Sequence, residues 1–252
     1  MKDLIPFIEA FDPHFRSSVK GASWWHVEYL EEVLGTSLPE TYVSFAETFA
    51  DTDGGLLSDC ESHHPDHVAK LYRVGAIDSP SHRYLFVLGD PSFTSQHYFM
   101  DLAAMEDGDA PVFRSTLDDL PTVSDPDYTF TSLRELLYHK AYVHLRLPQL
   151  PHQAGFVDAY RAGDEHQEES AGREAIEGVE ALFSRIGFDR HPFPERCRLY
   201  ERGDAAVALY RPPEVDRFSF QIGMQEETEF QEMTALLLDH LDLQQRNLPS
   251  TT

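Results

Sequence analysis

The chain is poor in cysteine and in positive charge, and both shortages restrict what it can be. Its 252 residues include only two cysteines, Cys60 and Cys197, whose separation suggests no disulfide framework. It has 44 acidic residues against 20 lysines and arginines, which gives a net charge of −24. Such a charge opposes binding to nucleic acids and anionic membranes, because both are polyanions. We therefore expect neither as a partner.

Long apolar runs are scarce as well. The longest, YLFVL and ALLL, are far shorter than a membrane span, and the N-terminal MKDLIPFIEAFDP has no apolar core of a secretory signal. We therefore expect a cytoplasmic protein. The sequence also contains no phosphate-binding loop, no GxGxxG motif and no GxSxG nucleophile elbow.

The acidic residues are spread along the chain. Residues 1–150 contain 24 acids and 10 bases, and residues 151–252 contain 20 acids and 10 bases. A charge of this kind either keeps the surface solvated or favours a basic protein partner.

The most informative stretch is a predicted helix pair between Val27 and Gly55. Apolar residues recur at helical spacing up to Leu34, and Gly35 follows as a helix stop. Ser37 and Glu40 have the spacing of a capping box for the second helix, with a proline in its first turn.

The rest of the first half predicts a small antiparallel sheet and a closing helix. The segments 71–74, 83–89, 96–102 and 111–115 have strand composition, whereas the histidine-rich segment 56–70 is expected to be a loop. The turn EDGDAP suits a hairpin-like reversal, and Ser132 with Glu135 matches a capping box for the last helix.

Composition divides the chain into two α+β units joined by a linker. The first domain is expected to cover residues 1–147, with an N-terminal extension. Residues 148–171, which are polar and rich in small residues, form the predicted linker. Residues 172–252 have the pattern helix, three strands, helix, and the Arg-Gly-Asp step at 202–204 suits a hairpin turn.

Two groups of residues are candidates for metal binding or catalysis. Cys60, His63, His64 and His67 are close enough in sequence to hold zinc, but no second Cys/His pair lies at finger-like distance. His97 and Asp101 fall on one face of a predicted strand, as a base and its orienting carboxylate would, but no nucleophile accompanies them. We therefore predict no metal, no cofactor and no enzymatic activity, and an enzyme built on either group is the weaker alternative.

Acidic loops and a tryptophan pair are the better candidates for binding a partner. Charge complementarity supplies steering and specificity, and aromatic residues are enriched at interfaces. The tryptophans could equally hold the N-terminal segment on the first helix. The candidate partner-binding residues are Asp51, Asp53, Glu106, Asp107, Asp109, Asp118, Asp119, Trp24 and Trp25.

An ordered set of motifs runs through residues 27–141: LEEVLGTSLPETYVSF, the Asp-Gly-Gly of DTDGG, the strand ending in Gly89-Asp90, YFMDL, PVF and TSLRELL. In these motifs the segment resembles the SUKH superfamily, which includes fungal cell-wall-synthesis regulators and bacterial immunity proteins of polymorphic toxin systems. The chain departs from the family pattern at PSFTSQH, where a glycine-rich turn is common, and in its histidine-rich insertion.

The resemblance implies a non-enzymatic α+β module that binds a protein, most specifically an immunity protein that neutralises a basic toxin. The alternative is an intracellular regulator or scaffold of the same fold without a toxin partner. The oligomeric state, and the role of residues 172–252, stay open.

Overall fold

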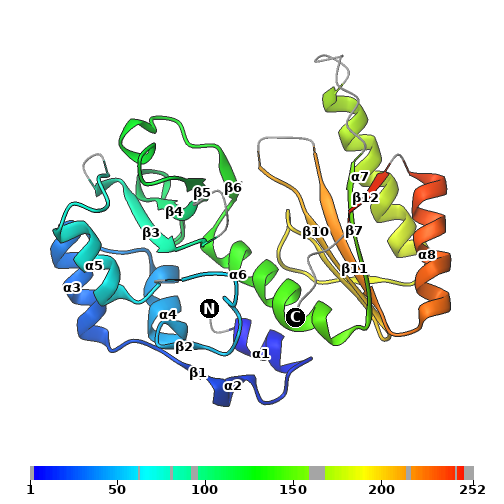
Figure 1. Cartoon of the computed structure of the whole chain (residues 1–252), viewed down its shortest axis with the longest axis horizontal. Coiled ribbons are helices and arrows are strands. Elements are labelled where there is room, and N and C mark those ends of the chain that lie inside the picture. The colour runs from blue at the N-terminus through cyan, green and yellow to red at the C-terminus, as the bar shows by residue number, and fades with distance from the viewer. Residues whose placement is uncertain are drawn as a thin grey trace. The chain divides into compact units, whose positions relative to one another are not determined.

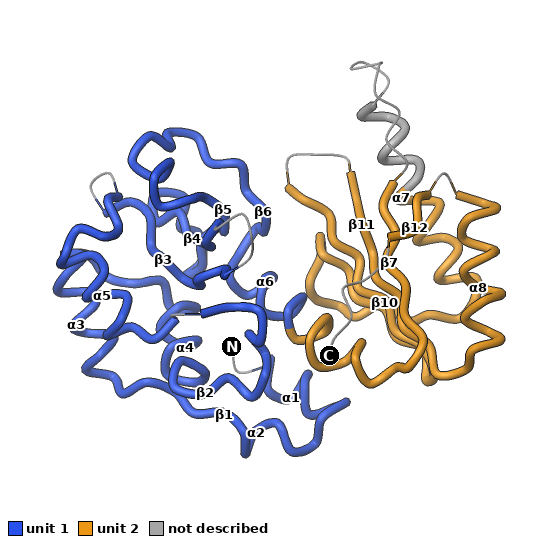
Figure 2. Tube along the Cα trace, in the orientation of Figure 1, with its two compact units in different colours: residues 1–140 blue, residues 141–252 orange. Residues whose placement is uncertain are grey.

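The computed structural model describes residues 3–61, 63–79, 82–91, 96–158, 168–213, 217–241 and 243–246, with the backbone alone for 168–175. The chain divides into two compact units, residues 1–140 and 141–252 (Figure 2). Each unit combines helices with antiparallel strands, so the predicted α+β class is confirmed.

The first unit contains a four-stranded antiparallel meander, a two-stranded ribbon and helices (Figure 1). The meander has the order β3 (Tyr84–Leu88), β4 (His97–Asp101), β5 (Val112–Ser115) and β6 (Tyr128–Phe130), and the ribbon pairs β1 (Val19–Lys20) with β2 (Thr52–Asp53). The α-helices that begin in this unit are α1 (Leu4–Glu9), α2 (Phe15–Ser18), α3 (Trp24–Leu34), α4 (Glu40–Phe49), α5 (Pro65–Arg73) and α6 (Leu133–Ala141). Two 3₁₀ turns are η2 (Leu102–Ala104) and η3 (Leu120–Thr122).

The predicted helix pair forms, but its second helix starts differently. Gly35 ends α3 in the left-handed region, with φ of 68°, as expected. The capping box at Ser37 and Glu40 is wrong, because α4 begins at Glu40 and Pro39 precedes it without a side-chain cap. The backbone N–H of Thr41 donates to the Gly108 carbonyl oxygen (3.0 Å), so a distant loop covers this helix end.

The segment 56–70 was predicted as a loop and the segment 71–74 as a strand, but a helix, α5, runs from Pro65 to Arg73 and includes parts of both. Both predictions are therefore wrong for these residues. Pro65 occupies the first turn, and Nδ1 of His64 accepts the N–H of Asp66 (3.3 Å). The Asp66–Lys70 ion pair follows at i, i+4. Helix α5 lies beside α3 (Figure 1), and Tyr72 bonds to the main chain of β3.

The second unit is a six-stranded antiparallel sheet with two helices on one face. The strand order is β12 (Leu243–Arg246), β7 (His152–Asp158), β11 (Ser219–Met224), β10 (Ala205–Tyr210), β9 (Leu199–Arg202) and β8 (Asp189–Arg190). Apolar residues of this sheet, of α7 (Glu168–Arg185) and of α8 (Glu227–His240) form one core, and Figure 1 shows both helices on the same side of the strands. The hairpin turn at 202–204 joins β9 to β10 as predicted.

The predicted second domain and linker need correction. Helix α7, three strands and α8 occur in the expected order, but the sheet also contains β7, β8 and β12. Strand β7 lies inside the predicted linker 148–171 and pairs on both edges, with β11 and with β12. The unit therefore begins near Ala141 rather than at 172, and residues 159–167 of the linker lie outside the described residues.

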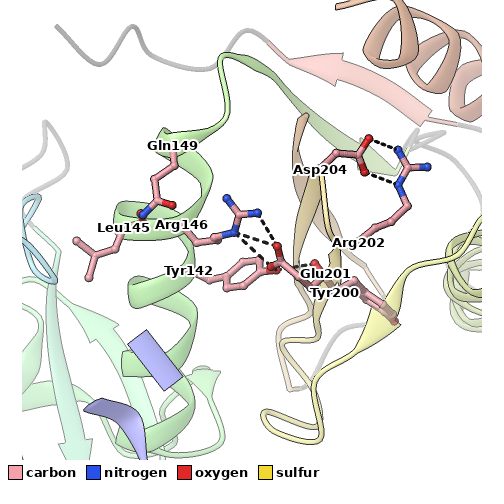
Figure 3. Close-up of polar contacts among 8 residues, drawn as sticks. All are labelled: Tyr142, Leu145, Arg146, Gln149, Tyr200, Glu201, Arg202 and Asp204. Carbon is pink, nitrogen blue, oxygen red and sulfur yellow. Dashed lines mark hydrogen bonds and ion pairs between the residues drawn. The ribbon is translucent and has the colours of Figure 1, made fainter. Parts of the chain in front are cut away.

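The opposite face of this sheet is covered by a π-helical turn, η4 (Tyr142–Arg146), and a 3₁₀ turn, η5 (Leu147–Gln149). Figure 3 shows how η4 is fastened to β9. The Tyr142 hydroxyl shares its proton between the Tyr200 carbonyl oxygen (2.6 Å) and the Glu201 carboxylate. The buried Arg146 guanidinium donates to Glu201 Oε1 through Nε (3.0 Å) and Nη2 (2.5 Å). Burial raises the pKa of Tyr142, which keeps this donor protonated.

Candidate partner-binding surface

The tryptophan pair lies at the first turn of α3. Trp24 is 59% exposed and Trp25 is 54% exposed, and their rings meet edge to face with centroids 6.0 Å apart. An exposed pair of large aromatic side chains on a regular helix is a preformed apolar contact. The alternative role, holding the N-terminal segment on the helix, would bury the rings and does not fit this exposure.

Histidine rings connect this pair to an acidic corner of the first unit. The ring of Trp25 lies 5.4 Å from that of His26, which in turn lies 4.8 Å from the ring of His64. Asp51, next to β2, is exposed and bound to Lys20. We call Trp24, Trp25, His26, Asp51 and His64 the Trp–His surface.

The electrostatics of this surface keep Asp51 charged and His64 uncharged at neutral pH. The Lys20 ammonium, with smaller effects of His64 and His26, lowers the pKa of Asp51. Burial, and then the neighbouring His26, lowers the pKa of His64. In the described part of the chain, the buried Nδ1 of His26 has no hydrogen-bond partner. The surface therefore combines exposed indoles with a carboxylate that is paired with Lys20, and it contains an unsatisfied ring nitrogen of His26.

Asp53 follows Asp51 by two residues, but its carboxylate accepts a hydrogen bond within its own turn. Its Oδ1 accepts the N–H of Gly55 (2.7 Å), and its Oδ2 is 3.9 Å from Nε2 of His63. Burial lowers the pKa of His63, so this contact is a weak one at neutral pH. Asp53 therefore shapes the loop after β2, and its charge adds to that of Asp51.

Glu106, Asp107 and Asp109 form a second group at the opposite end of α4. The loop at Gly108 touches the start of α4 at Thr41, whereas Asp51 follows its end, so a helix of ten residues, about 15 Å long, separates the two groups. Glu106 and Asp109 pair through their backbones (2.9 and 3.0 Å), and the intervening Asp107 and Gly108 have positive φ, so the predicted reversal is a tight hairpin turn.

Two of the acidic candidates have structural roles instead of free carboxylates. Asp109 accepts the backbone N–H groups of Leu133 (3.0 Å) and Arg134 (3.2 Å) at the start of α6, and burial raises its pKa. Asp119 accepts the Thr116 hydroxyl (2.7 Å) in a local turn. Glu106, Asp107 and Asp118 are exposed and remain available for contact.

The residues weighed for metal binding are held in separate interactions. Cys60 lies near Asp59 and the Lys140 ammonium, and burial raises the pKa of its thiol to about 12. His64 caps α5, and His67 is exposed. No group of three potential ligands comes together to hold a metal in the residues that the structure describes.

His97 and Asp101 likewise serve different partners. Asp101 is fully buried and receives Nε (2.8 Å) and Nη2 (2.5 Å) of Arg83 and the hydroxyl of Tyr128 (3.0 Å). Burial alone would raise its pKa, but these donors outweigh burial and lower it. His97 accepts the N–H of Asp90 through Nδ1 (3.2 Å). The predicted pairing of a base with its carboxylate is therefore not formed.

Sequence reasoning missed His26 as part of the Trp–His surface and Lys20 as the partner of Asp51. The run WWH placed His26 beside the indoles, but only the packing of α3 against α5 brings it to His64. No family model and no curated protein matches the chain, so the resemblance of residues 27–141 remains a prediction from motifs. Among the described helices, none has the length and apolar character to cross a bilayer.

Proposed function

We propose that the chain is a non-enzymatic module that binds a basic protein through the Trp–His surface. The observation that supports this most is the pair of exposed indoles, Trp24 and Trp25, which His26 connects to the corner of the unit that contains Asp51. Tryptophan is enriched among residues that contribute most to binding. Because Asp51 is paired with Lys20, the attraction of a cationic partner comes mainly from the net charge of −24.

The most specific form of the proposal is an immunity protein that neutralises a toxin domain in the cytoplasm. Its supports are the SUKH-like motifs between residues 27 and 141 and the acidity of the whole chain. An acidic protein can cover the cationic face of a basic nuclease, because that face is built to attract the phosphates of nucleic acid.

The test is co-expression with each toxin-like reading frame adjacent to the gene. The proposal predicts that one such toxin stops growth alone, that the full chain restores growth, and that the two proteins co-purify. The association rate should fall as salt is raised, because screening weakens steering by charge. Recovery of a non-toxic partner on the same surface would favour the regulatory alternative, and failure to bind any adjacent product would count against the immunity role.

A further inference from the structure

An open cleft of about 470 Å³ lies at the β8–β9 edge of the second unit, apart from the Trp–His surface. Its lining residues are Arg190, His191, Pro192, Glu195 and Arg198. Two arginines in one cleft stand out in a chain that has more than twice as many acids as bases. The lining carries two guanidinium groups and one carboxylate, that of Glu195.

The two guanidinium groups are held close together by one neutral atom. Nη2 of Arg190 and Nε of Arg198 both donate to the backbone carbonyl oxygen of Glu195, at 3.2 Å and 3.0 Å. Arg198 also pairs with Glu180 on α7, which neutralises one of the two charges. A guanidinium has five N–H donors, so within the described residues most donors of Arg190 remain available.

A buried hydroxyl beside these groups has no partner. Tyr200 is 2% exposed, and its phenolic oxygen makes no hydrogen bond with the part of the chain that the structure describes. Tyr200 is the direct register partner of Arg190, and Arg198 precedes it by two residues along the same strand direction. The three side chains therefore lie on one face of the sheet, the face that α7 covers.

The electrostatics of Tyr200 agree with this arrangement on one face of the sheet. Burial raises the pKa of Tyr200, and the charges of Arg198 and Arg190 oppose that rise. A buried hydroxyl without a partner is unfavourable, and a ligand with several acceptor oxygens would satisfy it together with the guanidinium donors. A phosphate group has such oxygens on every side, whereas a planar carboxylate has two in one plane.

We propose that this cleft binds a phosphate group, either the free ion or the phosphate of a small monoester, through Arg190, Arg198 and the Tyr200 hydroxyl. The volume leaves room for an organic group beyond the phosphate. Glu195 lines the cleft and is exposed, so its carboxylate is the group that opposes an anion there. This proposal is independent of the proposed protein partner.

The experiment is calorimetric titration of the full chain with inorganic phosphate and with adenosine monophosphate, at constant ionic strength against chloride. We expect saturable binding, weakened about tenfold by R190Q, which removes one charge-assisted contact. Y200F should weaken binding while leaving the unliganded protein as stable as the wild type, because its hydroxyl has no described partner. Tighter binding of the monoester than of the free ion would indicate that the organic group is also bound.

Two further variants keep the test decisive. E195Q should strengthen binding, because it removes the opposing carboxylate, and a simple loss of fold could not produce that gain. R217Q, which alters an exposed arginine paired with Asp158 elsewhere in the unit, should leave phosphate affinity unchanged. Absence of saturable binding up to about 10 mM phosphate, or equal losses in R190Q and R217Q, would overturn the proposal.

Discussion

The carboxylate of Asp109 holds the start of α6 by accepting the backbone N–H of Leu133, 24 residues away, at 3.0 Å. A second bond from Arg134 completes the cap. An acidic residue that sequence alone assigns to partner binding therefore belongs to the fold. The hairpin turn before it and the helix after it are joined through this one side chain.

Replacing Asp109 with alanine should lower the free energy of unfolding by about 1–2 kcal/mol, because two N–H groups at the helix start lose their acceptor. Urea unfolding followed by circular dichroism measures the change. D118A, which removes the carboxylate of an exposed aspartate, is the control and should have little effect. Equal stability of D109A and wild type would show that water replaces this cap at no cost.

The buried ion pair between Asp101 and Arg83 predicts a pH-dependent term in stability. Because the folded pKa of Asp101 is lowered, its contribution is complete above its unfolded pKa of about 3.9 and is lost as pH falls through the lower folded value. D101N should cost about 3 kcal/mol at neutral pH, since it leaves Arg83 unpaired. The melting temperatures of wild type and D101N should approach each other as pH falls below the unfolded pKa and through the lower folded one. If the difference between the two melting temperatures stays constant to within about one degree from pH 7 to pH 2.5, the ion pair is not its cause.

Gly223 on β11 lies so close to Leu150 that a side chain at this position would not fit. A Cβ there would meet Leu150 at 2.9 and 3.0 Å, so η5 and β11 would have to separate. G223A should destabilise the protein by about 1–3 kcal/mol. G203A provides the control, because a Cβ at Gly203 meets no atom within 4 Å and the turn there needs no positive φ. Thermal unfolding of both variants decides whether space or chain flexibility is responsible.

The Arg146–Glu201 pair shown in Figure 3 fastens η4 to β9, and its removal should be costly only when one partner is left behind. We expect about 2 kcal/mol for E201Q, less than for a fully buried pair because the Glu201 side chain is 32% exposed. The double variant R146M/E201Q should recover part of this loss. E229Q is the control: Glu229 pairs with Arg202, which also pairs with Asp204, so the change should affect stability little. Additive losses in the double variant would contradict a coupled pair.

Local patterns predicted the strands and helices that have clear composition. The continuous apolar run became β3, and the cap of Ser132 on Glu135 N–H (3.0 Å) forms as expected. Helix α5 was missed because its polar, histidine-rich composition is typical of a loop, and its stripe of Val68, Ala69 and Tyr72 is short. Strand β12, LQQR, has no apolar alternation, because it is an edge strand with mostly exposed side chains.

In the candidate site too, sequence patterns predicted the features that depend on local sequence and missed those that depend on tertiary packing. Trp24 and Trp25 were predicted from their adjacency, and Asp51 from its loop, since both signals are local. Their connection through His26 and His64 depends on two helices that are distant in sequence, and no spacing rule could indicate it. The position of the 106–109 turn at the start of α4, away from Asp51, is also set by tertiary structure.

The measurement that tests the central claim most directly is the affinity of the W24A/W25A variant for the toxin or other protein that binds the full chain. Both side chains are exposed, so the variant should unfold within about 0.5 kcal/mol of wild type. Its dissociation constant should rise about 100-fold, whereas L238A, at an exposed leucine of the second unit, should bind as wild type does. Unchanged affinity in a folded W24A/W25A protein would contradict the account.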